Sequence, residues 1–336
     1  MKDTNELYSN RIEYLDVAKG LGIMLIILGH TDLPVCLKSW IFSFHVPLFL
    51  IVSGYCFKQR SLKHILNKGW RQLLRPFLIT HVICFVGLFF LCYVRLWDRS
   101  HLLNWFLNVV FITRYGTGRG LWFLGGLLWA KIWLTLLLKF NRICTVIFLI
   151  ALFLIAWLLN SSYDKMPWYI PQGMACTMFL AFGYFLRCFN IIEQCSYKGI
   201  LLLCFIIICF GNLMYINVFN FIYGFGLFSV IGTMCISFSV LVLLKELCQI
   251  SSLLLIRRFF LYVGTNTLLI LCIHSIIHTW QLQTHIPYLH PYSIGFVEFV
   301  GIVLFTTVVN KFGLIQKYFH PRESVWSTWG IKKECK

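Results

Sequence analysis

Long apolar stretches separated by short polar connections run through almost the whole chain. Each stretch is long enough, or nearly so, to cross the roughly 30 Å hydrocarbon core of a bilayer as a helix. The pattern predicts an all-α integral membrane protein with about ten transmembrane helices and no separate soluble domain. The expected spans are residues 14–33, 39–57, 77–96, 121–139, 143–160, 172–190, 199–217, 221–244, 259–280 and 294–312.

Polar segments flank this apolar block at both ends. We expect residues 1–13 to form a cytoplasmic N-terminal segment, 14–312 the transmembrane domain and 313–336 a cytoplasmic tail. Lys and Arg gather in the connections after the second, fourth, sixth and eighth spans, and most of the alternate connections are poor in them. Because cytoplasmic loops carry the excess of positive charge, both termini are predicted to be cytoplasmic.

The connection between residues 95 and 120 departs from this rule. It lies on the predicted outer side and yet carries four arginines, and its apolar centre indicates an interfacial or re-entrant helix. These cations could bind an anionic acceptor, or the topology could differ there. The four residues are Arg95, Arg99, Arg114 and Arg119.

Composition agrees with a membrane protein and narrows its chemistry. The 336 residues are 59% hydrophobic and 12% charged, whereas soluble domains average about 25% charged residues. The net charge of +17 could indicate nucleic-acid binding, but the basic residues lie mostly between apolar stretches, so we expect none. The fourteen cysteines form no CxxC pair and no cluster with zinc-ligand spacing, so we also expect no metal.

The first apolar stretch carries ionisable residues where charge is costly. At about 100° per residue, Lys19 and His30 lie on nearly the same side of a helix and roughly 16 Å apart along its axis. Asp16, three residues before Lys19, shares that side and could form an ion pair with it. Asp32 could orient His30 or cap the helix end. The stripe indicates the two ends of a reaction path.

Two further stretches place polar groups inside expected spans. In the second, Pro47 is expected to bend the helix, so that His45 borders a cavity. Ser53 could carry an acyl group, although the Ser-Gly pair also suits close helix packing. In the ninth, His274 and His278 share a helical face, which could bind zinc, but no third ligand is evident.

Five segments, taken in order, resemble the membrane acyltransferase-3 family. They are LDVAKGLGIMLIILGH, WIFSFHVPLFLIVSGYCF, KGWRQLLRPF, GLWFLGGLLWA and FLYVGTNTLLILCIHSIIH, and the resemblance runs from about residue 11 to 312. Members of this family are polytopic enzymes that O-acylate sugars. The chain is most similar to the fucose 4-O-acetylase type of polysaccharide acetyltransferase.

The resemblance assigns expected roles to particular residues. His30 stands at the family histidine of the first helix, and Lys19 stands where most members have arginine. Lys keeps the charge but loses the bidentate fork of Arg. Trp122 matches a family tryptophan, which could stack on a sugar or lie in the interfacial belt of aromatic residues. His274 matches the family's helix-end histidine and is expected on the acceptor side.

Acetyl transfer from a thioester to a hydroxyl needs a base and stabilisation of an oxyanion. We expect His30 to be the base, with catalytic contributions from Asp16, Lys19 and His45. Asp32, Trp122 and His274 are expected to contact the acceptor. Acetyl-CoA is the expected donor, because a basic helical face could dock its phosphates, although that face also fits positive-inside topology and anionic lipid. The face consists of Lys68, Arg71 and Arg75, and Lys19 is expected to assist it.

The sequence therefore predicts an O-acetyltransferase of the bacterial inner membrane, with multiple spans and both termini cytoplasmic. It would move acetyl from cytoplasmic acetyl-CoA to a sugar hydroxyl of a cell-surface or lipid-linked glycan, among membrane lipids. The alternative is a glycan flippase or small-solute transporter without transferase activity, against which stand the order of the five segments and the absence of an internal repeat.

Overall fold

Helices make up nearly all of the computed structural model, which describes residues 12–94, 120–159, 167–195, 211–280 and 291–311, with a few isolated positions between these ranges. One two-stranded hairpin interrupts them. The longer helices are α2 (Glu13–Gly29), α3 (Val35–Phe42), α4 (His45–Tyr55), α5 (Leu62–Gly69), α6 (Arg75–Tyr93), α8 (Trp122–Leu137), α9 (Arg142–Leu158), α10 (Ile170–Cys188), α13 (Leu227–Leu247), α14 (Leu254–Thr265), α15 (Thr267–Thr279) and α16 (Pro291–Val309). The short elements are η1 (Trp70–Leu74), η4 (Pro167–Tyr169), α11 (Ile191–Gln194), η5 (Gly211–Leu213), β1 (Ile216–Asn217), β2 (Ile222–Tyr223) and η6 (Ser251–Leu253).

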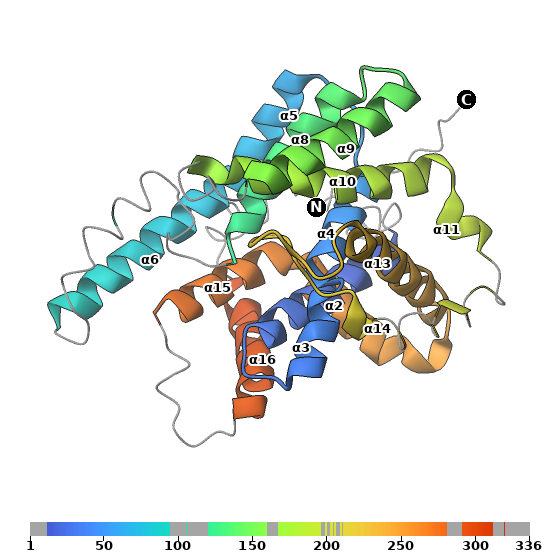
Figure 1. The fold of residues 1–336 in the computed structure, drawn as a ribbon. Helices are drawn as coiled ribbons and strands as arrows, with labels where there is room; N and C mark the ends of the chain where they lie inside the picture. Colours follow the sequence, from blue (N-terminus) through green and yellow to red (C-terminus); the bar gives the residue numbers. More distant parts are fainter. Residues whose placement is uncertain are drawn as a thin grey trace, which may run out of the picture.

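The helices form two groups joined by α4 (Figure 1). In one group α10 packs against α8 and α9, and α5 packs against α8. In the other, α2 lies at the centre and contacts α3, α13, α14, α15 and α16. Helix α4 touches both α10 and α2, so it connects the two groups.

Small residues let the central helices approach closely. Gly54 of α4 lies against the backbone of Leu180, and Gly183 of α10 lies against the backbone of Ile51. A side chain at either glycine would collide with a main-chain carbonyl of the facing helix. Such contacts are typical of helix packing in membranes, where apolar burial alone does not favour association. Ser53 is fully buried beside this crossing, which agrees with a packing role for the Ser-Gly pair.

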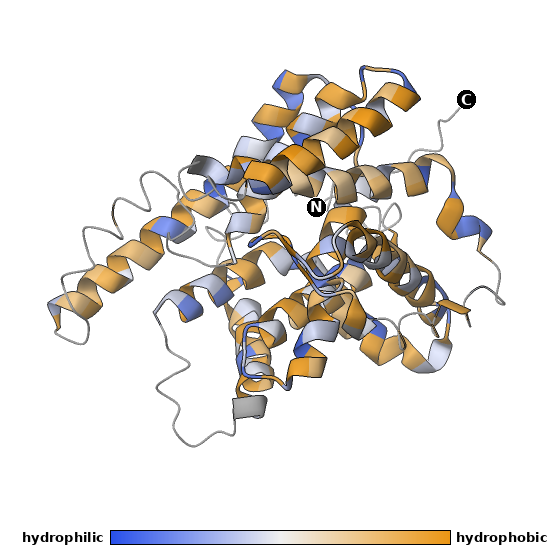
Figure 2. Ribbon diagram, in the orientation of Figure 1, coloured by the Kyte–Doolittle hydropathy of each residue, from blue (hydrophilic) through white to orange (hydrophobic). Residues whose placement is uncertain are grey.

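The protein has the character of a membrane protein. By length and composition, however, fewer helices qualify as spans than the sequence predicts. Among the residues that the structure describes, three helical segments qualify as spans, namely Val35–Tyr55, Leu62–Tyr93 and Leu227–Leu247. A bent pair, Ser251–Thr265 with Thr267–Thr279, would make a fourth. Apolar residues colour most of the long helices (Figure 2). The all-α, membrane-like class is thus confirmed, and the figure of ten spans stays a prediction.

The expected helix 39–57 is broken, but not by its proline. Helix α3 ends at Phe42, the chain turns through Ser43 and Phe44, and α4 begins at His45. Pro47 then lies in the first turn of α4, where its missing N–H removes no helical hydrogen bond. The prediction that Pro47 bends the span was wrong, and the break lies immediately before His45.

The expected helix 259–280 is bent by 71° at Asn266. The Asn266 side-chain amide donates to the backbone carbonyl of Tyr262, with an N···O distance of 2.8 Å. It also bonds Thr265 Oγ1 at 3.3 Å, and its oxygen accepts from Asn310 Nδ2 at 2.8 Å. An asparagine that bonds its own backbone competes with the helical ladder, and this one separates α14 from α15.

The expected helices 199–217 and 221–244 are wrong where they approach each other. Strands β1 and β2 pair antiparallel there, with Ile216 opposite Tyr223. The Asn217 side-chain oxygen accepts from the backbone N–H of Asn220 at 3.1 Å, which stabilises the turn. Three parts of the sequence-based prediction lie outside the described residues. They are the four arginines of the connection 95–120, nearly all of the tail beyond 311 and nearly all of the first thirteen residues.

Candidate active site

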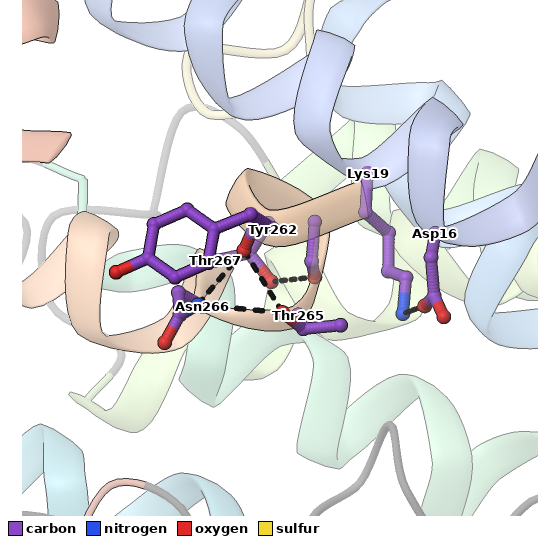
Figure 3. Close-up of polar contacts among 7 residues, drawn as sticks. Asp16, Lys19, Tyr262, Thr265, Asn266 and Thr267 are labelled. Atoms are coloured by element: carbon purple, nitrogen blue, oxygen red, sulfur yellow. Dashed lines mark hydrogen bonds and ion pairs between the residues drawn. The ribbon is translucent and has the colours of Figure 1, made fainter. Parts of the chain in front are cut away.

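Helix α2 ends one residue before His30, which forms its C-cap through a backbone N–H bond to the carbonyl of Ile27. Lys19 and Asp16 lie nearer the other end, where both are buried, at 3% and 4% exposure, and form an ion pair. The pair lies beside the bend between α14 and α15 (Figure 3). The structure therefore supports the ion pair that was one of two interpretations of Lys19. A contact between Lys19 and a donor stays a prediction.

Close packing surrounds this ion pair. Gly264 of α14 lies against the backbone of Asp16, and Gly20 of α2 lies against the backbone of Phe260. Such contacts leave no room for a side chain at either glycine. Neither Lys19 nor Asp16 lines the cavity of about 500 Å³ at the other end of α2.

The other end of α2 opens on a cavity of about 500 Å³. Three histidines line it, and each comes from a different helix: His30 from the end of α2, His45 from α4 and His278 from α15. Lys38 of α3 and Trp122 of α8 line it too. The hairpin supplies the remaining polar wall through Asn217 and Asn220.

Three imidazole rings form one cluster at this cavity. The rings of His30 and His274 are stacked, with centroids 5.4 Å apart and planes at 27°. His278 meets both edge-on, at 5.7 Å from His30 and 5.8 Å from His274. Within the described segments the His30 ring makes no hydrogen bond, so its nitrogens are free to meet a substrate. His30, which is distant from His274 and His278 along the chain, therefore lies next to both of them in the structure.

A buried carboxylate faces this cluster. Glu298 Oε1 of α16 lies 2.7 Å from His274 Nδ1, and the two side chains are 5% and 1% exposed. An ionised carboxylate only accepts hydrogen bonds, so Nδ1 carries the hydrogen. The sequence reasoning missed Glu298. The signal was present, since a lone acidic residue inside an apolar span calls for a partner.

His45 has its ring orientation set by the backbone. Its Nδ1 lies 2.8 Å from the carbonyl oxygen of Ile41, to which it must donate. A neutral His45 therefore presents Nε2 as an acceptor. The break before α4 leaves the Ile41 carbonyl outside the α4 ladder and so makes this bond possible.

Trp122 is 8% exposed and packs against Phe219 of the hairpin, with ring centroids 5.3 Å apart. It lines the cavity, which places it at the site and not at the lipid-facing surface. Asp32, by contrast, is exposed beyond the end of α2 and does not line the cavity.

The basic face lies on another side of the protein, where α5 passes through the π-helical turn η1 into α6. Arg71 is exposed, and Lys68 and Arg75 are half-buried. None of the three lines the large cavity, but the neighbouring residues Gln72 and Leu73 line a second, narrow one of about 20 Å³. A π-turn of this kind is frequent at functional sites.

The narrow cavity adjoins the large one. Both are lined by Ile26, Phe123 and Leu271, so these three residues form a common wall between the histidine cluster and Gln72. Lys131 of α8, which the sequence did not single out, lies near Lys68 where α5 packs against α8. Phosphate oxygens can accept charge-assisted hydrogen bonds from lysines at such a place.

No group of three His, Cys, Asp or Glu side chains in the described ranges has the geometry of a metal site. The expectation that the protein uses no metal stays a prediction, as does acetyl-CoA as donor.

A helical membrane protein with a histidine-lined cavity is thus defined, and comparison with known proteins adds its family. A family model described as an acyltransferase domain matches residues 12–310. The chain therefore belongs to the acyltransferase-3 family and is an acyltransferase. No curated protein and no solved structure gives a significant match.

Proposed function

We propose that the protein is an O-acetyltransferase that moves acetyl from cytoplasmic acetyl-CoA to a sugar hydroxyl of a cell-surface or lipid-linked glycan. The fucose 4-O-acetylase-like subtype is the closest description of that activity. The observation that carries the proposal is the convergence of His30, His45 and His278 on a cavity of about 500 Å³. This volume falls within the roughly 300–1,000 Å³ typical of small-molecule sites.

His30 is the general base in this proposal. Its ring makes no hydrogen bond to the described protein atoms and faces the cavity, so it can accept the proton of a bound sugar hydroxyl. The sugar oxygen then attacks the thioester carbonyl, the C–S bond breaks, and the proton passes from His30 to the thiolate of coenzyme A. His45 Nε2, oriented by Ile41, is a second acceptor on the same cavity.

Glu298 supports the base through His274. The Glu298 carboxylate is hydrogen-bonded to His274, and the imidazole of His274 stacks on His30. The negative charge of this carboxylate favours the imidazolium that forms when His30 takes the proton, and burial of Glu298 and His274 strengthens the effect. We therefore assign Glu298 and His274 as positioning residues.

The donor approaches from the cytoplasmic side in this proposal. Its phosphates contact Lys68, Arg71, Arg75 and Lys131, and its acyl arm extends past Gln72 through the narrow cavity to His30. The two cavities are neighbours that share Ile26, Phe123 and Leu271 in their walls, which supports this path. In this proposal the helices lie in the bacterial inner membrane, and the positive-inside distribution of Lys and Arg supports an orientation with both termini cytoplasmic.

Purified protein, radiolabelled acetyl-CoA and a total glycan fraction test the function. Label in the glycan, retained after removal of the protein, is the expected result. Donor binding without transfer to any hydroxyl would contradict O-acetylation. Absence of donor binding together with solute movement across vesicles would favour the alternative, a flippase or transporter.

A further inference from the structure

The cavity has a polar side that the transfer chemistry does not use. Lys38 of α3 lines it, and so do Asn217 and Asn220 of the hairpin. Helix α3 packs against strand β1, and the rings of Phe42 and Tyr215 stack across that contact with centroids 5.6 Å apart. The lysine and the asparagines therefore belong to one wall.

Lys38 is a half-buried cation that has no ionic partner among the described residues. Its Nζ reaches the carbonyl oxygen of Thr31 at 3.5 Å, which is the long limit for a hydrogen bond. No carboxylate of the described segments forms an ion pair with it. Positive-inside topology does not account for it either, because it lies on the predicted outer side.

Asn217 adds hydrogen-bond donors to the one that Lys38 supplies. Its side-chain oxygen accepts from the backbone N–H of Asn220, so the Nδ2 group is the part left for a ligand. Within the part of the chain that the structure describes, this Nδ2 has no other hydrogen-bond partner. An ammonium and an amide N–H at one cavity select an anion, and charge-assisted bonds of this type are the strong ones.

We infer that Lys38 and Asn217 form an anion subsite that selects acceptors carrying a carboxylate or phosphate beside the sugar ring. The inference rests on the proposed function for the identity of the sugar as acceptor. Trp122 and Phe219, which line the same cavity, offer the apolar face for the ring. The anion is either the carboxylate of an acidic sugar or the phosphate that links a glycan to its lipid carrier.

The subsite and the base lie at the same cavity, because Lys38 and His30 both line it. An anion held by Lys38 therefore brings a negative charge to the cavity in which His30 takes up the proton, and a nearby negative charge favours an imidazolium. A neutral sugar lacks this effect, which makes Lys38 a specificity-determining residue.

Ligand binding without any acyl donor tests the subsite independently of transfer. Tryptophan fluorescence of the purified protein is followed during titration with glucuronate, glucose 1-phosphate and glucose at matched ionic strength. One of the two anions is expected to bind about tenfold more tightly than glucose, through its charge-assisted bonds. Tighter glucuronate identifies an acidic sugar, and tighter glucose 1-phosphate identifies the carrier linkage. Trp122→Phe should reduce the signal.

Matched variants separate the subsite from general charge. Lys38→Gln should abolish the preference for the anion while glucose binding stays unchanged, and Lys38→Arg should retain it. Lys139→Gln removes the same charge from an exposed position after α8 and should have no effect. Equal binding of all three sugars, absence of saturable anion binding, or an anion preference that survives Lys38→Gln would overturn the inference. Because no donor is present, failure of the proposed transferase function would leave these results unchanged.

Discussion

The two ends of α2 both carry polar groups inside an apolar protein, but they are handled differently. At one end Asp16 and Lys19 neutralise each other where α2 and α14 touch backbone to backbone. At the other end His30 lines a cavity of about 500 Å³, and its ring forms no hydrogen bond within the described residues. A buried ion pair has its charges satisfied by each other and so serves the structure. An imidazole at a cavity can instead take up or release a proton near neutral pH. Chemistry is therefore expected at the histidine end.

Removing His30 should produce the largest loss. His30→Ala takes away the proposed general base, whose contribution is typically about 100- to 10,000-fold in rate. The measurement is initial acetyl transfer from radiolabelled acetyl-CoA in membranes, normalised to the amount of folded protein. His64→Ala, at an exposed histidine of α5, is the control and should retain full activity. Full activity in His30→Ala would remove the distinction between the two ends.

Part of this contrast could be predicted from the sequence. Helical spacing alone placed Asp16, Lys19 and His30 on one side of one helix, because α-helical geometry is local and regular. The helices themselves follow from apolar runs of membrane length. The grouping of the histidines could not be predicted. His274 meets His30, and Glu298 meets His274, only because α15 and α16 pack against α2.

The errors have local causes as well. Residues 216–223 are apolar enough to resemble a helix, but Asn217 turns the chain into a hairpin. Asn266 similarly breaks a continuous apolar run by bonding its own backbone. The role of Lys38 could not be predicted either, because nothing in its neighbours along the chain indicates a cavity.

At the other end of α2, the sharpest test breaks the ion pair between Asp16 and Lys19. Lys19→Met leaves the Asp16 carboxylate buried without its cation and should cost about 3–5 kcal/mol of stability. Thermal unfolding in detergent measures the loss. The double variant Asp16→Asn/Lys19→Met should recover most of it, because no uncompensated charge remains. A double variant as unstable as the single one would contradict a mainly structural pair, and a raised KM for acetyl-CoA in a stable double variant would add a donor contact.

Glu298→Gln should have an intermediate effect on catalysis. The amide keeps the shape and an acceptor atom but removes the negative charge behind His274, so kcat should fall by about 10- to 100-fold, as for a lost charge-assisted contact of roughly 1.5–3 kcal/mol. KM for the acceptor should change little, because Glu298 does not line the cavity. Glu246→Gln in α13 makes the same chemical change elsewhere. A fall in expression without any fall in kcat would mean that Glu298 only stabilises the fold.

The smallest expected effect belongs to the basic face of α5 and η1, which is predicted to be cytoplasmic. The charge reversals Arg71→Glu and Arg75→Glu should raise the KM for acetyl-CoA by up to about tenfold, because they weaken charge-assisted contacts to its phosphates. Arg60→Glu, exposed in the connection before α5, controls for topology. Impaired membrane insertion with an unchanged KM would assign these arginines to topology alone.

The central claim is that proton transfer at His30 drives acetyl transfer, and chemical rescue tests it most directly. His30→Gly creates space for free imidazole next to the cavity, and added imidazole should restore a substantial part of the lost transfer rate in a saturable manner. Cyclopentanol, a five-membered ring of similar size that is not a base, should restore none. Wild-type activity in the unrescued variant would contradict the claim, and so would a folded, donor-binding His30→Gly protein that imidazole leaves inactive.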